Sequence, residues 1–140
     1  MIDLQTTEML VKRAQAAAKK AYAPYSGFFV GAALLCADGS VYDGCNVENC
    51  SYPVGCCAER VALFKAVSDG KTEFLAMAVV GGKNGKISDF CPPCGMCRQA
   101  LSEFCDGDFA VILSDGKTDK KYALSELLPA AFKKANGGEK

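Results

Sequence analysis

The 140-residue sequence contains no histidine and carries no net charge. The missing histidine excludes any catalytic or metal site that depends on an imidazole. Sixteen basic and sixteen acidic side chains cancel, which argues against a nucleic-acid partner, because binding to phosphates usually demands a basic surplus. A small or neutral partner is therefore the better expectation.

Long apolar segments and targeting signals are also missing. The longest apolar run, Phe28 to Ala37, is too short to cross a bilayer, so we expect no membrane partner. The N-terminus has an acid at Asp3 and lacks the basic and apolar regions of a signal peptide, which predicts a cytoplasmic protein. In such a reducing compartment, nine cysteines indicate metal binding, catalysis or packing, and an odd number cannot pair completely.

No repeat, low-complexity block or Gly/Ser/Pro linker divides the chain, and its length fits one domain. We expect a single domain over residues 1–140, with about residues 133–140 forming a flexible tail. Hydrophobic spacing and turn residues predict the elements along it. In order, they are a helix from Thr6 or Thr7 to about Lys20, a hairpin of strands Phe28–Cys36 and Ser40–Val47, a helix at Cys57–Val67, a strand at Phe74–Val80, a helix at Gly95–Phe104, a strand at Phe109–Leu113, an edge strand at Tyr122–Ala123 and a short helix capped by Ser125.

This order predicts an α/β protein of three layers, α/β/α, with a mixed central sheet of about five strands. The strand–helix–strand unit from Phe74 to Leu113 is expected to be a right-handed parallel crossover. Between the hairpin and the next helix lies a loop, Asn46–Gly55, that is longer than the connection requires. Long ordered loops in compact domains are often functional.

The strongest local signal is the segment "CPPCGMCRQ", in which two residues separate Cys94 from Cys97 at the predicted start of a helix. A thiol there ionises easily, because free backbone N–H groups and the helix dipole stabilise the thiolate. A pair of zinc ligands is one interpretation, since only the thiolate binds zinc. A redox dithiol and two packed cysteines are the alternatives.

The segment "VGCCAER" favours the metal, because it places Cys57 two positions before Glu59. A catalytic zinc typically takes three protein ligands and keeps its fourth position open. Zinc deaminases combine a ligand-x-Glu motif with P-C-x-x-C, the glutamate acting as a general acid and base. Cys57, Cys94 and Cys97 would hold one Zn²⁺ per chain. Only Cys57, and not Cys56, has the required offset from the glutamate.

Five blocks of the sequence resemble the small cytidine deaminases that use three cysteines and assemble as homotetramers. The blocks are "AYAPYSGFFVGAALL" (Ala21–Leu35), "GCNVEN" (Gly44–Asn49), "CAERVALFKAV" (Cys57–Val67), "PCGMCRQ" (Pro93–Gln99) and "ELLPAAF" (Glu126–Phe132). The resemblance implies the cytidine-deaminase fold and a pyrimidine-salvage activity. That activity is hydrolysis of cytidine and deoxycytidine to uridine and deoxyuridine with release of ammonia. It also implies a homotetramer whose active sites are shared between subunits.

The resemblance also implies roles for individual residues. Glu59 would take a proton from the attacking water and pass protons to N3 and to the departing amino group. Substrate contacts would come from Asn46 and Glu48 to the ribose, Phe28 to the face of the base, the Ala58 backbone N–H to the base carbonyl, and Phe132 to the pocket of a neighbouring subunit. Without the family, core packing for Phe28, turn chemistry for Asn46 and a solvated charge for Glu48 are the default interpretations.

Three thiolates leave a formal negative charge on the zinc site, which weakens the ability of the metal to acidify water. Arg60 and Arg98 each follow a site residue directly, so both are candidates to hydrogen-bond a sulfur and tune this charge. The resemblance favours Arg60 in this role. For either arginine the alternative is an ordinary surface or inter-subunit ion pair, and for Arg98 the two are equally expected. Cys56 and Cys91 sit beside proposed ligands, where they could compete for zinc or oxidise against it.

Other functions remain open at this point. A deaminase of a modified cytosine nucleoside, such as a nucleoside antibiotic, would share the zinc core. A polynucleotide deaminase fits poorly with zero net charge and a chain barely larger than a catalytic core. A zinc-stabilised interaction module without turnover would have no need of Glu59. A thiol redox protein would form a reversible disulfide between Cys94 and Cys97 and bind no metal.

Overall fold

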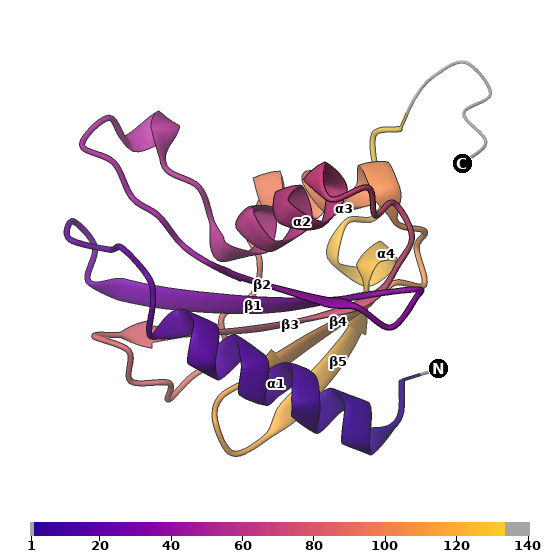
Figure 1. Cartoon of the computed structure of the whole chain (residues 1–140), viewed down its shortest axis with the longest axis horizontal. Coiled ribbons are helices and arrows are strands. Elements are labelled where there is room, and N and C mark those ends of the chain that lie inside the picture. The colour runs from indigo at the N-terminus through magenta and orange to yellow at the C-terminus, as the bar shows by residue number, and fades with distance from the viewer. Residues whose placement is uncertain (1, 134–140) are drawn as a thin grey trace.

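The computed structural model describes residues 2–133 and contains a five-stranded sheet with helices on both faces (Figure 1). Its elements are α1 (Leu4–Ala18), β1 (Phe28–Cys36), β2 (Val41–Cys45), the 3₁₀ helix η1 (Tyr52–Val54), α2 (Ala58–Ser68), β3 (Phe74–Lys83), α3 (Gly95–Phe104), β4 (Ala110–Ser114), β5 (Asp119–Ala123) and α4 (Leu124–Leu127). The strand order is β2-β1-β3-β4-β5, with β3 and β4 parallel and the other pairs antiparallel. The predicted mixed α/β sheet is confirmed. The predicted tail lies outside the described residues except for Lys133.

Both faces of the sheet are buried along most of β1, β3 and β4, which explains why these three strands read as nearly continuous apolar runs. Successive side chains of a strand point to opposite faces. On β3, Ala78 faces the cluster formed with α1, whereas Met77 and Val79 face the cluster formed with α2 and α3. The core is therefore divided by the sheet into two layers, each closed by its own helices.

Two glycines let helices approach the sheet backbone directly. A Cβ atom at Gly31 of β1 would come within 1.9 Å of the Ala14 carbonyl oxygen of α1. At Gly44 of β2, a Cβ would lie 2.4 Å from the Ala58 carbonyl oxygen of α2. No side chain fits at either point, so Gly44 sets how closely the first turn of α2 lies against β2.

The structure corrects two predicted helix caps. Helix α1 begins at Leu4, because the Asp3 carboxylate accepts the N–H of Thr6 at 2.7 Å and takes the capping role expected of Thr6 or Thr7. At α4, the Glu126 carboxylate accepts the N–H of Ala123 at 3.0 Å, so Ser125 is not the cap. Several polar side chains lie near each helix start. The residue at which the chain enters the helix decides which of them forms the cap.

The long loop between β2 and α2 is ordered by backbone pairing. Val47 forms isolated bridges with Tyr22 and with Cys56, and η1 occupies the middle of the loop. The bridge to Tyr22 ties this loop to the segment between α1 and β1. Figure 1 shows the two connections projecting from the same end of the sheet.

Within residues 2–133, no helix has both the length and the apolar character that a membrane span requires.

Replacing Gly31 by alanine tests the close contact between α1 and the sheet. We expect a loss of roughly 1–3 kcal/mol in the free energy of unfolding, because the added methyl group has to displace helix backbone. Urea unfolding followed by circular dichroism measures this loss. Gly55→Ala is the matched control, since its Cβ would meet neighbours only at 3.4 Å. Equal stability of the two variants would contradict the tight contact.

Candidate metal centre

Three cysteine sulfurs converge where two helices begin. Cys57 is the N-cap of α2, Cys94 is the N-cap of α3, and Cys97 lies in the first turn of α3. The Cys57 and Cys94 sulfurs are 3.9 Å apart, and those of Cys94 and Cys97 are 3.5 Å apart. All three lie within 4.8 Å of one another. Two motifs 37 residues apart in the sequence thus form one cluster.

This cluster has the dimensions of a zinc site. Zn–S bonds of about 2.3 Å in tetrahedral geometry hold sulfur atoms about 3.8 Å apart. The observed separations of 3.9 Å and 3.5 Å bracket that value. Among the described residues, these three cysteines are the one group of His, Cys, Asp or Glu side chains close enough to share an ion. The three thiols therefore fit the metal that the motifs predict, with no further ligand from residues 2–133.

Charge at the cluster is balanced by Arg60. The pKa of Cys57 is lowered to about 5, chiefly by the hydrogen bond from the Cys97 thiol and also by the nearby Arg60 guanidinium, against the opposing effect of burial. Arg60 Nη2 lies 3.5 Å from the Cys57 sulfur. Its Nε is buried and has no hydrogen-bond partner among the described residues. The Arg60 guanidinium therefore lies where it can offset the negative charge of the Cys57 thiolate.

Glu59 is buried beside the cluster without belonging to it. Its side chain is only 4% exposed, and its carboxylate is not among the three ligand groups. Burial raises the pKa of Glu59 to about 7, and the negative charge of Cys57 adds to this effect. An acid with a pKa near neutrality can both accept and donate a proton, which is what general acid–base catalysis requires.

Arg98 does not contact the sulfurs, and its predicted role in tuning the zinc charge is wrong. Its Nε donates to the Pro93 carbonyl oxygen at 2.8 Å, and its Nη1 donates to the Leu127 carbonyl oxygen at 2.7 Å. The side chain therefore joins the ligand loop to the end of α4. This is a structural contact, and it replaces the ion pair that was the other expectation.

Asn46 and Glu48 both turn toward the segment that leads into β1. The Asn46 amide accepts the N–H of Val30 and donates to the carbonyl oxygen of Phe28, both at 2.8 Å. Glu48 accepts the N–H groups of Tyr25 and Ser26 at 3.0 and 3.1 Å, and it also accepts the Ser26 hydroxyl. The two side chains therefore lie on the same side of their extended segment, as a shared contact with a sugar would require.

The remaining predicted contacts occupy different positions. Phe28 begins β1 and is partly exposed, and Ala58 is fully buried as the first residue of α2. Phe132 lies beyond α4 with 80% of its surface exposed. Its carbonyl oxygen accepts the Gln99 side-chain amide at 3.0 Å. Within the single chain, the Phe132 ring is thus not enclosed by any pocket.

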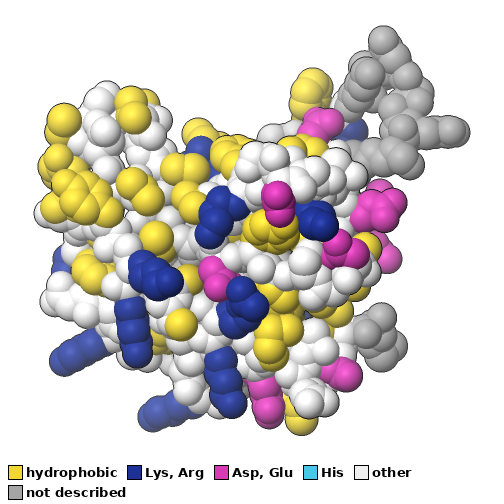
Figure 2. Space-filling model, in the orientation of Figure 1, with side chains coloured by type: hydrophobic (Ala, Val, Ile, Leu, Met, Phe, Trp, Pro, Cys, Tyr) yellow, Lys and Arg dark blue, Asp and Glu magenta, His cyan; other side chains and the backbone are white. Residues whose placement is uncertain are grey.

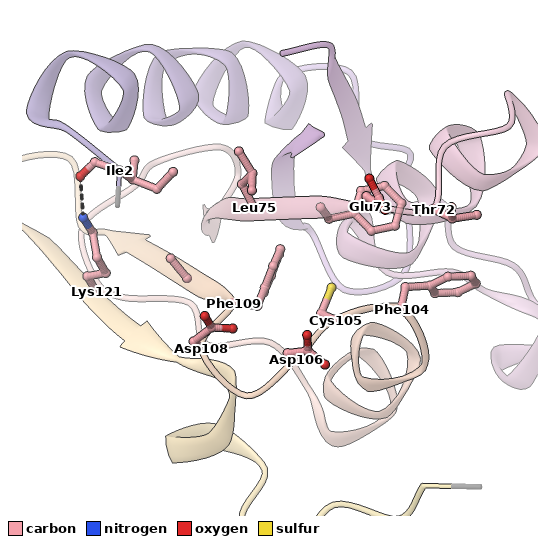
Figure 3. Close-up of a pocket in the computed structure, with 12 residues that line it drawn as sticks. Ile2, Thr72, Glu73, Leu75, Phe104, Cys105, Asp106, Asp108, Phe109 and Lys121 are labelled. Carbon is pink, nitrogen blue, oxygen red and sulfur yellow. Dashed lines mark hydrogen bonds between the residues drawn. The ribbon is translucent and has the colours of Figure 1, made fainter. Parts of the chain in front are cut away.

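A cavity of about 270 Å³ opens beside Glu48. Its lining comprises Tyr25, Ser26, Glu48, Asn49, Tyr52 and Gly55. A larger cavity of about 730 Å³ lies near Phe104, at the opposite end of α3 from Cys94, and is bordered by Ile2 and Lys121 (Figure 3). None of the predicted site residues lines this larger cavity. Of the predicted site residues, Glu48 is the one that lines the smaller cavity.

Cys56 and Cys91 stay outside the metal cluster. Burial raises the pKa of both thiols, that of Cys91 to about 11, so neither is a ready thiolate. The Cys91 sulfur packs over Gly81, where a Cβ atom would come within 2.9 Å of it. The expected competition for zinc is therefore not supported by this geometry.

The sequence interpretation missed Ser26 and Lys83. The Ser26 hydroxyl contacts the Glu48 carboxylate, and the Ser26 carbonyl oxygen accepts the Lys83 ammonium group at 2.7 Å. A serine between proline and glycine signals a turn. Nothing local in the sequence identifies its carboxylate partner 22 residues away.

Zinc content tests the cluster directly. We expect one zinc per purified chain and a loss of most of it in Cys94→Ala, because two thiols rarely hold the metal firmly. Atomic absorption against protein concentration measures the ratio. Cys50→Ser is the control, since Cys50 is exposed and lies outside the cluster. A full complement of zinc in Cys94→Ala would show that the metal binds elsewhere.

Comparison with known proteins agrees with this geometry. Residues 4–113 match the family model of the cytidine and deoxycytidylate deaminase zinc-binding region. The cytidine deaminase of Sporosarcina psychrophila is 49% identical over 128 residues, which cover 91% of each chain. A crystal structure of cytidine deaminase from Burkholderia pseudomallei superposes with a TM-score of 0.82 at 45% identity, covering 89% of this chain and 98% of that one. Blasticidin-S deaminase of Bacillus cereus is 31% identical over 107 residues, 74% of this chain and 76% of the relative.

The family model spans both halves of the metal centre, Cys57 to Glu59 and Cys94 to Cys97. The sulfur cluster with its buried glutamate thus coincides with the region that defines these enzymes. On these grounds, the chain belongs to the zinc-dependent cytidine and deoxycytidylate deaminase family.

Proposed function

We propose that this protein hydrolyses cytidine and deoxycytidine to uridine and deoxyuridine, with release of ammonia. The observation that carries the proposal is the buried carboxylate of Glu59 beside three sulfurs within 4.8 Å of one another. A structural zinc site has no use for a buried carboxylate that is not a ligand. The relatives at 49% and 45% identity described above are cytidine deaminases, which supports the same substrate class.

Cys57, Cys94 and Cys97 would hold the zinc, which supplies Lewis-acid activation of water when bound. Glu59 accepts the proton of that water and delivers protons first to N3 of the cytosine ring and then to the departing amino group. Burial of Glu59 keeps its pKa near neutrality, so the same carboxyl group performs both transfers. The guanidinium of Arg60 offsets the excess negative charge of the thiolates.

Residues around the centre would hold the nucleoside. The Ala58 N–H belongs to the first turn of α2, where backbone donors have no partner inside the helix, and it is available to the base carbonyl. Phe28 would pack against the base. Asn46 and Glu48, on one side of their segment, would bind the sugar hydroxyls, and Glu48 also lines the smaller cavity.

Glu59→Gln should abolish turnover without removing the metal. The amide keeps the shape of the side chain but cannot exchange protons, so we expect kcat for cytidine to fall by about 10²–10⁴-fold. Release of uridine and ammonia gives the rate, and atomic absorption gives the zinc content. Glu103→Gln, an exposed position on α3, is the matched control and should retain full activity.

Either of two results would contradict this mechanism. Turnover by Glu59→Gln at the wild-type rate would remove Glu59 from the reaction. A folded, zinc-loaded wild type that releases no ammonia from cytidine or deoxycytidine would remove plain nucleosides as substrates.

We further propose a homotetramer in which Phe132 enters the pocket of a neighbouring subunit. The isolated chain leaves apolar side chains exposed on the loops near the candidate site, where Figure 2 shows them gathered at the upper left. They are Tyr22, Tyr25, Val47, Tyr52 and Val54. Exposed apolar patches of this kind mark contact surfaces, and Phe132 adds another large apolar group.

Subunit complementation tests the shared site. Phe132→Ala and Glu59→Gln chains, each of low activity alone, should regain activity when coexpressed. A mixed tetramer would contain sites with Glu59 from one chain and Phe132 from its neighbour. Sedimentation velocity gives the assembly state, and ammonia release gives the activity. If Phe132 serves its own chain, no mixed site is complete and coexpression restores nothing.

A role in pyrimidine salvage and a cytoplasmic location complete the proposal. None of the cysteines forms a disulfide within residues 2–133, and a site built from thiolates is best preserved in a reducing compartment.

A modified cytosine nucleoside is the second candidate substrate. The similarity to Blasticidin-S deaminase favours it, because that relative covers 74% of this chain. Parallel assays of cytidine and blasticidin S separate the two candidates. A kcat/KM higher for the antibiotic than for cytidine would favour the second.

A further inference from the structure

The turn before β1 is tied to Glu48 through one serine. The Ser26 hydroxyl donates to one Glu48 carboxylate oxygen and accepts the N–H of Phe28 at 3.0 Å. The other carboxylate oxygen accepts the backbone N–H groups of Tyr25 and Ser26 at 3.0 and 3.1 Å. Ser26 thus links the residue expected to bind the sugar with the residue expected to pack on the base.

The turn itself is held from a third direction. Lys83, at the end of β3, donates its ammonium group to the Ser26 carbonyl oxygen at 2.7 Å. The backbone N–H of Asn84 donates to the carbonyl oxygen of Gly27, also at 2.7 Å. Gly27 has a positive φ of 65°, a conformation that other residues rarely adopt. Ser26 is therefore fixed at its backbone as well as at its hydroxyl.

These contacts limit what Glu48 can still bind. An ionised carboxylate offers about four acceptor positions. Three are taken by Tyr25 and by the two donors of Ser26, which leaves roughly one for a substrate hydroxyl. The Ser26 hydroxyl is also the main reason that the pKa of Glu48 is lowered, so the side chain stays charged and strongly accepting. The turn therefore sets both the direction in which the Glu48 carboxylate points and its charge.

We propose that Ser26 is the positioning residue for sugar recognition, holding Glu48 toward the nucleoside hydroxyls and coupling it to the backbone of Phe28. This inference rests on the proposed nucleoside deaminase function. It predicts that removing the Ser26 hydroxyl lowers activity only on substrates whose sugar hydroxyls bond with Glu48. Damage to the turn as a whole would instead affect every substrate alike.

Kinetics of Ser26→Ala on two substrates test the proposal. Cytidine has the 2′- and 3′-hydroxyls with which Glu48 is proposed to bond, whereas 2′,3′-dideoxycytidine lacks both and keeps only the 5′-hydroxyl. We expect kcat/KM for cytidine to fall by roughly 10–100-fold, the loss of a hydrogen bond to a charged group. For dideoxycytidine, we expect a change of less than about threefold. Ser26→Thr keeps the hydroxyl at an exposed position and should restore most of the cytidine activity.

Two further variants sharpen the result. Ser40→Ala removes a similar serine–carboxylate bond, to Asp38 in the β1–β2 turn, and should leave both substrates unaffected. In a Glu48→Ala background, adding Ser26→Ala should cost no further activity on cytidine, because the two residues act through one contact. Independent, additive losses would overturn the coupling.

The outcomes separate this proposal from the function on which it rests. Equal losses on both substrates, or no loss on cytidine, in an active enzyme would overturn the role of Ser26 alone. If the zinc-loaded wild type is inactive, calorimetry tests the role of Ser26 instead. It measures how tightly the wild type and Ser26→Ala each bind cytidine and dideoxycytidine. A loss of affinity confined to cytidine supports Ser26 while the deaminase proposal fails. Absence of nucleoside binding overturns both.

Discussion

The structure depends on holding three sulfurs within 4.8 Å of one another. Thiolates at this distance repel strongly in a low-dielectric site, so the arrangement needs positive charge from its surroundings. The N-termini of α2 and α3 supply backbone N–H groups, and Arg60 contributes its guanidinium. Close packing of α2 on Gly44 brings the first of these helices to the required depth. The packing of α2 on the sheet, the two helix N-termini and the Arg60 guanidinium therefore all help to offset the repulsion between the sulfurs.

The same burial that strengthens these attractions acts in the opposite direction on Glu59. A carboxylate is disfavoured where water is excluded, so the pKa of Glu59 rises to about 7. The same environment thus favours the anionic form of Cys57 and the protonated form of Glu59. The difference follows from their partners, since Cys57 has Arg60 and the neighbouring thiols, whereas burial dominates at Glu59.

The metal centre and the side of the site proposed to bind the sugar are built differently. Cysteine ligands and Glu59 lie at or near helix starts, where packing fixes them. The sugar side consists of a turn and a loop, held by hydrogen bonds between Ser26, Glu48 and Lys83. Loops carry specificity well because they vary without disturbing the core. The exposed apolar groups on these loops suit a neighbour that closes the site.

The sequence by itself determined most of the elements and the ligand set, because helix starts, apolar strands and the C-x-E and C-x-x-C spacings are local patterns. It made both Arg60 and Arg98 candidates to contact a sulfur, since each directly follows a site residue, and the family resemblance favoured Arg60. Only the tertiary structure showed their actual partners: Arg60 reaches back to Cys57, whereas Arg98 bonds to the Leu127 carbonyl, 29 residues further along the chain. The Ser26–Glu48 contact was equally hidden. Such partners meet only when the chain has folded, and no local pattern encodes their distance.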